Sequence, residues 1–161
     1  MIIKSKLVEK DFINVNFMLL WDRNLIKAFA GIVGVMFVIS VFGILFVKEL
    51  SDMSIPWGLF IFPVVVIGVT YFNAKRTFAA NSRIAETIEY GFTNEKFTVT
   101  GESFNANFAW GKLRKVTKSK KWILVWQSPQ SANPIPLQSF DQLQLDELKE
   151  ILENNKVKNN L

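Results

Sequence analysis

The pattern of apolar and polar residues divides the chain into an apolar part and a mixed part. Twenty residues from Ala28 to Val47 carry no charge, and a second uncharged run of eighteen residues extends from Ile55 to Phe72. As a helix rising about 1.5 Å per residue, the first run spans roughly 30 Å, the thickness of the hydrocarbon layer of a membrane. Neither run has the polar stripe of a surface helix. The pattern therefore predicts a membrane α-helical hairpin within residues 25–73, with spans at about 28–47 and 55–72.

The charges that flank these runs predict the topology. The connector Lys48–Ser54 is short and slightly acidic, whereas basic residues precede the first run and follow the second. Positively charged flanks stay in the cytoplasm. We therefore expect a multi-pass protein with both termini in the cytoplasm and the connector outside. The flanking cations are Lys4, Lys6, Lys10, Arg23 and Lys27 before the hairpin, and Lys75, Arg76 and Arg83 after it.

The predicted spans contain few polar groups. Ser40 and Thr70 carry their only aliphatic hydroxyls, and neither span contains Asp, Glu, Lys or Arg. Ion pathways usually need buried charges, so a channel or transporter subunit is the least favoured function. Ala30 and Gly34 are spaced so that a second helix could approach closely. This pair is therefore compatible with a homo-oligomer.

Two soluble segments flank the hairpin. Residues 1–24 predict a short strand, Met1–Val8, followed by an amphipathic helix, Asp11–Arg23, on the cytoplasmic side. Residues 74–161 predict a small α+β domain, an antiparallel sheet of about five strands with an amphipathic C-terminal helix. Pleckstrin-homology-like folds have the same order of elements. The five predicted strands are 87–93, 96–101, 104–110, 122–127 and 135–138.

The C-terminal helix is predicted at Asp141–Asn154. Leu145, Leu148, Ile151 and Leu152 share one of its faces. Asp141 can cap the helix, with Gln144 as the reciprocal partner of a capping box. Beyond Asn155 we expect a frayed tail.

A basic run between the third and fourth predicted strands is the most distinctive polar feature. It contains no acid and is bracketed by Trp110, Trp122 and Trp126. The run could bind anionic lipid headgroups, contact an acidic protein, or be a solvated hairpin that obeys the positive-inside bias. Nucleic-acid binding is disfavoured by the membrane tether. The candidate binding residues are Lys112, Arg114, Lys115, Lys118, Lys120, Lys121, Trp122 and Trp126.

Alternation along the fourth predicted strand places tryptophans on one face. Trp122 and Trp126 share that face, while Ile123 and Val125 lie on the other. One face is expected in the core and the other on the surface or in an interface, which favours a binding role. Trp110 ends a strand with alternating apolar residues, so we expect it in the core.

The composition excludes several kinds of chemistry. The chain has no cysteine and no histidine, which removes disulfides, thiolate nucleophiles, imidazole catalysis and Cys/His zinc sites. Asp146 and Glu150 are one helical turn apart, but Lys149 lies between them, as on an ordinary solvated helix face. No phosphate-binding loop or nucleophile motif is present. We expect no metal, no cofactor and no enzymatic activity.

Several short motifs resemble the bacterial YcxB-like family. They occur in the family's order and are followed by a leucine-rich helix. The N-terminal segment KLVEKDFINVNFMLLW also resembles the opening of that family, whereas Gln138 stands where the family prefers a basic residue. The resemblance implies two membrane spans and a cytoplasmic YcxB-like domain in the bacterial inner membrane. The motifs are Tyr90-Gly91-Phe92-Thr93, Phe97-Thr98-Val99, Trp110, Leu113, Val116, Trp122-Ile123-Leu124-Val125, Ile135-Pro136 and Phe140.

Two functions remain open alongside the disfavoured transporter. The first is a membrane-anchored regulatory or scaffolding protein whose YcxB-like domain binds a lipid or protein partner. The second is an immunity protein that neutralises a membrane-directed bacterial toxin by direct binding. Small size, lack of catalytic groups, an aromatic-rich surface and a short external loop would suit such an inhibitor.

Overall fold

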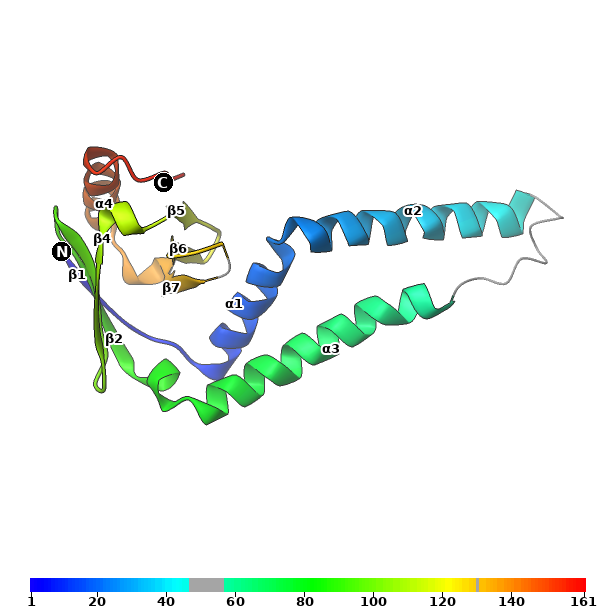
Figure 1. Cartoon of the computed structure of the whole chain (residues 1–161), viewed down its shortest axis with the longest axis horizontal. Coiled ribbons are helices and arrows are strands. Elements are labelled where there is room, and N and C mark those ends of the chain that lie inside the picture. Colours follow the sequence, from blue (N-terminus) through cyan, green and yellow to red (C-terminus); the bar gives the residue numbers. More distant parts are fainter. Residues whose placement is uncertain (47–56, 130) are drawn as a thin grey trace. The chain divides into compact units, whose positions relative to one another are not determined.

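The chain forms two compact units. The computed structural model describes residues 1–46, 57–129 and 131–161. Unit 1 comprises Met1–Glu9 and Ala80–Leu161, and unit 2 comprises Lys10–Ala79 (Figure 1). Unit 1 is therefore assembled from both ends of the sequence, with unit 2 inserted after its first strand.

The first sheet of unit 1 has four antiparallel strands. They follow each other in the order β1 (Ile2–Lys6), β2 (Thr87–Phe92), β3 (Lys96–Thr100) and β4 (Asn105–Ala109). Ile3 of β1 lies opposite Tyr90 of β2, and both side chains are buried. The N-terminal strand was predicted, but it does not form a separate segment with the helix that follows it. It joins this sheet because its buried side chains complete the core.

The second sheet has three antiparallel strands, β5 (Lys115–Lys118), β6 (Trp122–Trp126) and β7 (Ala132–Pro136). The prediction of about five strands in one sheet is therefore wrong, since β5 was interpreted as part of a connecting ribbon. The predicted strand at 135–138 is also shifted. β7 begins earlier, and Leu137–Ser139 forms the 3-10 turn η4.

The core of unit 1 lies between the inner faces of the two sheets and the helix α4 (Gln142–Asn154). Phe92 and Phe97 are fully buried, with ring centroids 5.1 Å apart. Trp110 is buried as predicted, and its indole N–H donates to the carbonyl of Thr93 at 2.9 Å. The buried face of α4 and its capping box at Asp141 and Gln144 are confirmed.

The segment after α4 is ordered, so the prediction of a frayed tail is wrong. Lys156 has a φ of 54°, and its amide donates to the carbonyl of Glu153. The amide of Val157 donates to the carbonyl of Leu152, and both side chains are buried. These two bonds and the apolar contact form a Schellman motif, after which the chain runs beside β5.

Unit 2 consists of three helices, α1 (Glu9–Trp21), α2 (Asn24–Phe46) and α3 (Trp57–Ala80). Phe12 of α1 contacts Phe78 of α3, and Phe29 of α2 contacts Phe62 of α3 at 4.6 Å between centroids. The Ser40 hydroxyl donates to a carbonyl one turn earlier in its helix. An added Cβ at Gly34 would meet nothing within 4 Å, so no described part of the chain packs there.

Large apolar side chains are exposed along α2 and α3. Val38 is 65% exposed, and Val64 and Phe72 are 68% and 69% exposed. Among the described residues, one stretch, Ile26–Gly43, is long and apolar enough to cross a membrane. The second span therefore stays a prediction, and the connector Lys48–Ser54 lies outside the described residues.

Candidate binding surface on the basic segment

The basic segment, defined as residues 112–121, contains β5 and the turn that leads into β6. It begins at the end of the 3-10 turn η3 (Trp110–Lys112), which is anchored by the buried Trp110. The amide of Ser119 donates to the carbonyl of Trp122 at 2.8 Å and closes the turn. The segment, predicted as a connection between two strands, therefore contains a strand of its own, which forms a hairpin with β6.

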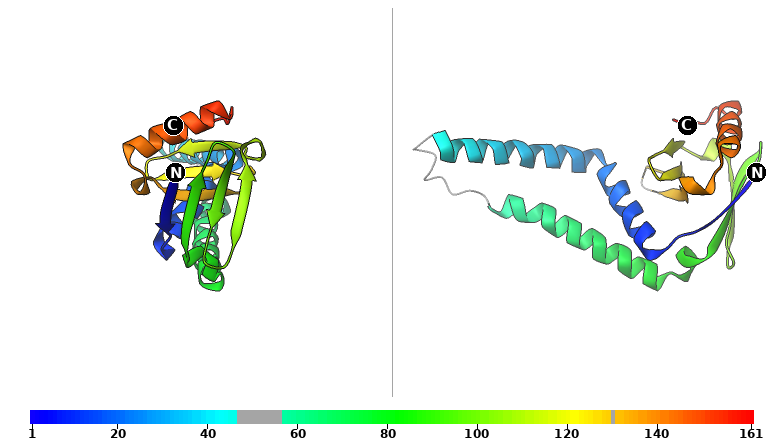
Figure 2. Two further views of the ribbon diagram at one scale, coloured as in Figure 1. Left: turned by 90° about the vertical axis from the view of Figure 1, so that its left-hand side faces the viewer. Right: turned by 180° about the vertical axis from the view of Figure 1, so that it is seen from behind.

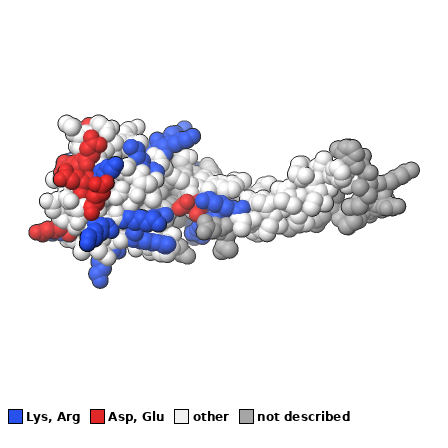
Figure 3. Space-filling view, turned by 90° about the horizontal axis from the view of Figure 1, so that it is seen from above, with Lys and Arg blue, Asp and Glu red and all other residues white. Residues whose placement is uncertain are grey.

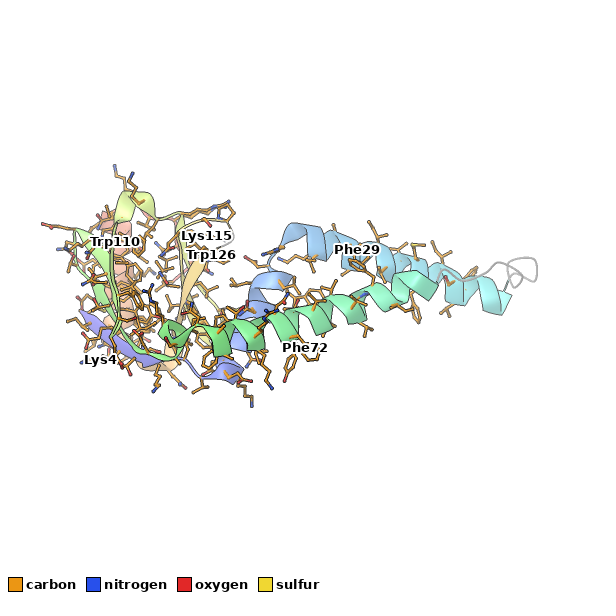
Figure 4. All side chains as sticks on the ribbon, turned by 60° about the horizontal axis from the view of Figure 1, so that its bottom comes forward. Lys4, Phe29, Phe72, Trp110, Lys115 and Trp126 are labelled. Atoms are coloured by element: carbon orange, nitrogen blue, oxygen red, sulfur yellow. The ribbon has the colours of Figure 1, made fainter. Side chains whose placement is uncertain are left out.

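Five of its six cations are exposed, and the sixth is held by a tryptophan. The Lys115 ammonium lies 4.7 Å from the centroid of the Trp126 ring, on the neighbouring strand (Figure 4). Such a cation–π contact favours one position of the lysine. The indole N–H of Trp126 donates to the Thr117 hydroxyl at 2.8 Å, which fixes the ring. The exposed cations are Lys112, Arg114, Lys118, Lys120 and Lys121.

The sequence around the basic segment contains no acidic residue. The sequence between Glu102 and Asp141 contains these six cations and no acid. Within the described part of the chain, none of the six forms an ion pair, whereas Lys4 pairs with Glu89. On the face drawn in Figure 3, one large acidic cluster and smaller separate acidic spots are visible, and most lysines and arginines lie outside the large cluster.

The C-terminal tail adds a cation that the sequence did not indicate. The amide of Val116 donates to the carbonyl of Lys158 at 2.9 Å, so the tail runs beside β5. Asn160 accepts from the amide of Lys118 at 2.7 Å through its side-chain oxygen. Lys158 is exposed. Because this contact joins positions about 40 residues apart, no local pattern could have revealed it.

The expectation that one face of this strand lies on the surface or in an interface is wrong, because both faces are buried. Ile123 and Val125 face the core, and both are fully buried. Trp122 and Trp126, on the opposite face of β6, are only 6% and 4% exposed. Alternation identified the two faces correctly but could not show that both are covered.

Two titratable groups of unit 1 have clearly shifted pKa values, and each shift has a structural cause. The pKa of Glu86 lies below its ordinary value because its carboxylate accepts hydrogen bonds from the hydroxyl and the amide of Ser103, at 2.6 and 3.0 Å. Burial raises the pKa of the Tyr90 phenol. Neither group belongs to a nucleophile–base pair. Among the described residues, no group of three or more acidic side chains is placed to hold a metal.

Comparison with known proteins gives one match. Residues 92–152 match the family described as YcxB-like protein. No curated protein and no solved structure matches the chain. The matched stretch runs from the end of β2 into the last turn of α4 and includes the whole basic segment. The resemblance inferred from the sequence is confirmed over this stretch, where residues 92–152 are similar to the YcxB-like family.

Proposed function

We propose that the chain is a non-enzymatic integral protein of the bacterial inner membrane whose cytoplasmic YcxB-like domain binds an anionic partner. In this proposal α2 and α3 are two spans with both chain ends inside the cell. The observation that carries it is the pairing of an apolar helical unit with a polar unit that presents unpaired cations. The regulatory or scaffolding role follows from this binding.

Two properties of the helices of unit 2 support a membrane location, namely their exposed apolar side chains and their internally bonded hydroxyls. Exposed Val38, Val64 and Phe72 would leave a large apolar surface in water, whereas lipid chains would cover it. The hydroxyls of Ser40 and Thr70 donate to carbonyls of their own helices. Polar groups within a bilayer must be satisfied internally in this way.

The basic segment supports anionic lipid as the partner over an acidic protein. Each cation near a charged membrane surface contributes about 1 kcal/mol. Protein interfaces usually depend on aromatic anchors, but Trp122 and Trp126 are buried. We therefore assign direct contact to the exposed cations and a supporting role to the tryptophans, with Trp126 holding Lys115. The order of a four-stranded sheet, a three-stranded sheet and a final helix also supports the pleckstrin-homology-like fold proposed for this domain.

The absence of cysteine from the chain makes a direct test practical. Ser119→Cys, at the first residue of the turn, would carry a fluorophore on the full chain reconstituted into phosphatidylcholine vesicles with or without phosphatidylglycerol. We expect a lipid-borne quencher to reduce the fluorescence more in the anionic vesicles, and salt to reverse the difference.

Combined reversal of Lys118, Lys120 and Lys121 to glutamate should abolish the difference, whereas the control Lys96→Glu on the other sheet should preserve it. Quenching that does not depend on lipid charge would exclude the lipid partner. A secreted toxin that copurifies in near-equal amount would instead support the immunity function.

A further inference from the structure

Among the described strands of unit 1, three of the four sheet edges are protected against pairing with another chain. The edge strand β1 carries Lys4 and Lys6, and charged side chains discourage edge-to-edge pairing. β7 contains Pro134 and Pro136, which lack the N–H that a further strand would need. The third edge, β5, is covered by the C-terminal tail through the bonds to Lys158 and Asn160 described above.

The fourth edge, β4, has none of these features. Its sequence, Asn105–Ala109, contains no charge and no proline. Among the described strands it pairs with β3 alone, and Figure 2 shows it at one side of the four-stranded sheet. An uncharged open edge of this kind is a template for another strand.

The hydrogen-bond pattern shows which backbone groups are available. The amide of Gly101 donates to the carbonyl of Phe104 at 2.9 Å, so these two residues form a hydrogen-bonded pair of the β3–β4 ladder. Bonded and non-bonded pairs alternate along an antiparallel ladder. The N–H and C=O groups of Asn105, Asn107 and Ala109 therefore point away from β3, and all three residues are exposed.

We infer that β4 pairs antiparallel with β4 of a second copy of this chain, with Asn107 on the twofold axis. In this register Asn107 lies opposite Asn107 of the second copy, and Asn105 lies opposite Ala109 of the second copy. All outward backbone groups of the three residues then find partners. A twofold interface uses the same patch on both chains, and the uncharged β4 brings no like charges together.

The charges at the two ends of β4 favour a second copy over an unrelated peptide. The turn before the strand carries Glu102, and η3 after it carries Lys112; both are exposed. Antiparallel pairing about Asn107 brings the turn of one copy to the η3 end of the other. Each Glu102 then approaches Lys112 of the second copy, and opposite charges in such a pair are favourable. Both copies would also be concentrated in the same membrane if the proposed anchor is correct.

Single-cysteine cross-linking of the full chain in its native membranes tests the register. Because the wild-type chain has no cysteine, Asn107→Cys can form a disulfide only between two chains. Opposite residues of an antiparallel pair have Cα atoms about 5.5 Å apart, which suits a disulfide. Asn105→Cys is the matched control, since its two copies would be about 14 Å apart along the strands.

We expect Asn107→Cys to give on the order of tenfold more disulfide dimer than Asn105→Cys, because Cα atoms more than about 7 Å apart do not bridge. Coexpressed Asn105→Cys and Ala109→Cys chains should cross-link with each other. Equal cross-linking of the two single variants would overturn the proposal.

A backbone change provides an independent measurement. Asn107→Pro removes an outward N–H and leaves the β3–β4 ladder intact, because the amide of Asn107 does not donate to β3. We expect this variant to be monomeric in mild detergent by native mass spectrometry, while Asn107→Ala stays dimeric. A dimeric proline variant, or a monomeric wild type, would contradict the inference. Neither result depends on the lipid partner proposed above.

Discussion

The two units of the chain differ in how far their aromatic side chains are buried. In unit 1 the aromatic residues Phe92 and Phe97 are completely buried between two sheets and a helix. In unit 2 Phe72 is 69% exposed and projects from a helix (Figure 4). Burial of apolar surface is the main force that stabilises a fold in water. Unit 1 therefore buries its aromatic residues in its own core, whereas unit 2 leaves large apolar side chains exposed.

The largest expected effect is a difference in stability between a change at the buried Phe97 and the same change at the exposed Phe72. Phe97→Ala should lower the free energy of unfolding of unit 1 by about 3–5 kcal/mol, because it leaves a cavity in a closed core. Phe72→Ala should change it by less than about 0.5 kcal/mol, as exposed substitutions usually do. Urea titration of the full chain in mild detergent, followed by near-ultraviolet circular dichroism, measures both. Comparable losses would show that Phe72 belongs to a packed core.

The second prediction tests whether helix α2 of unit 2 is inserted in a lipid bilayer. Val35 lies near the middle of α2 and is 60% exposed. Val35→Lys should make membrane insertion less favourable by about 2.5–3.5 kcal/mol, and Val35→Leu should leave it unchanged. The fraction of protein that resists alkaline extraction from membranes reports the difference. A lysine variant that stays fully integrated would mean that this face of α2 does not meet lipid.

The comparison also explains which parts of the fold the sequence could predict. Helix α4 was predicted closely because its apolar period and its capping box are local signals. Alternation located β2, β3, β4 and β6 to within one or two residues of their observed ends. Membership of β1 in the first sheet depends on β2, which is more than 80 residues away. Such distant pairing is determined by tertiary packing rather than by local pattern.

The candidate site was also predicted only in part, because some of its features depend on local sequence and others on distant contacts. The basic side chains were evident from composition, and their exposure was expected. β5 was missed because its sequence, Lys-Val-Thr-Lys, has one apolar residue and gains its strand structure from β6 and the C-terminal tail. The covered tryptophans were missed because alternation cannot show that both faces of a strand are buried. The open edge at β4 could be recognised only from the strand order and the pairing of the complete sheet.

A smaller effect tests whether the stability of unit 1 is independent of unit 2. Lys156 has a positive φ, which L-residues with a side chain adopt at a cost. Lys156→Gly should relieve this strain and stabilise unit 1 by about 1 kcal/mol. The control Lys158→Gly should bring no such gain, since its φ is not positive. The same urea titration measures both variants, and alkaline extraction should be unaffected. A change in extraction would show that the two units are coupled.

The smallest expected effect concerns the point where the chain re-enters unit 1, between the end of α3 and the start of β2. There Glu86 binds the hydroxyl and amide of Ser103 in the turn between β3 and β4, and these bonds lower its pKa in the folded state. A carboxyl group with a lowered folded pKa stabilises the fold above its unfolded pKa and loses that contribution as the pH falls through the folded pKa. Wild type should therefore exceed Glu86→Gln in stability by a constant amount above about pH 5. The difference should shrink at lower pH.

Ser103→Ala separates this local contact from a general effect of charge. It removes the hydroxyl donor and retains the amide donor, so it should reduce the pH-dependent difference without abolishing it. In the Glu86→Gln background the same change should have little additional effect, because residues that share one interaction are not additive. Urea titrations of the four variants between pH 3 and 7 would measure the coupling. A coupling that is independent of pH would mean that the negative charge of Glu86 adds nothing to its hydrogen bonds with Ser103.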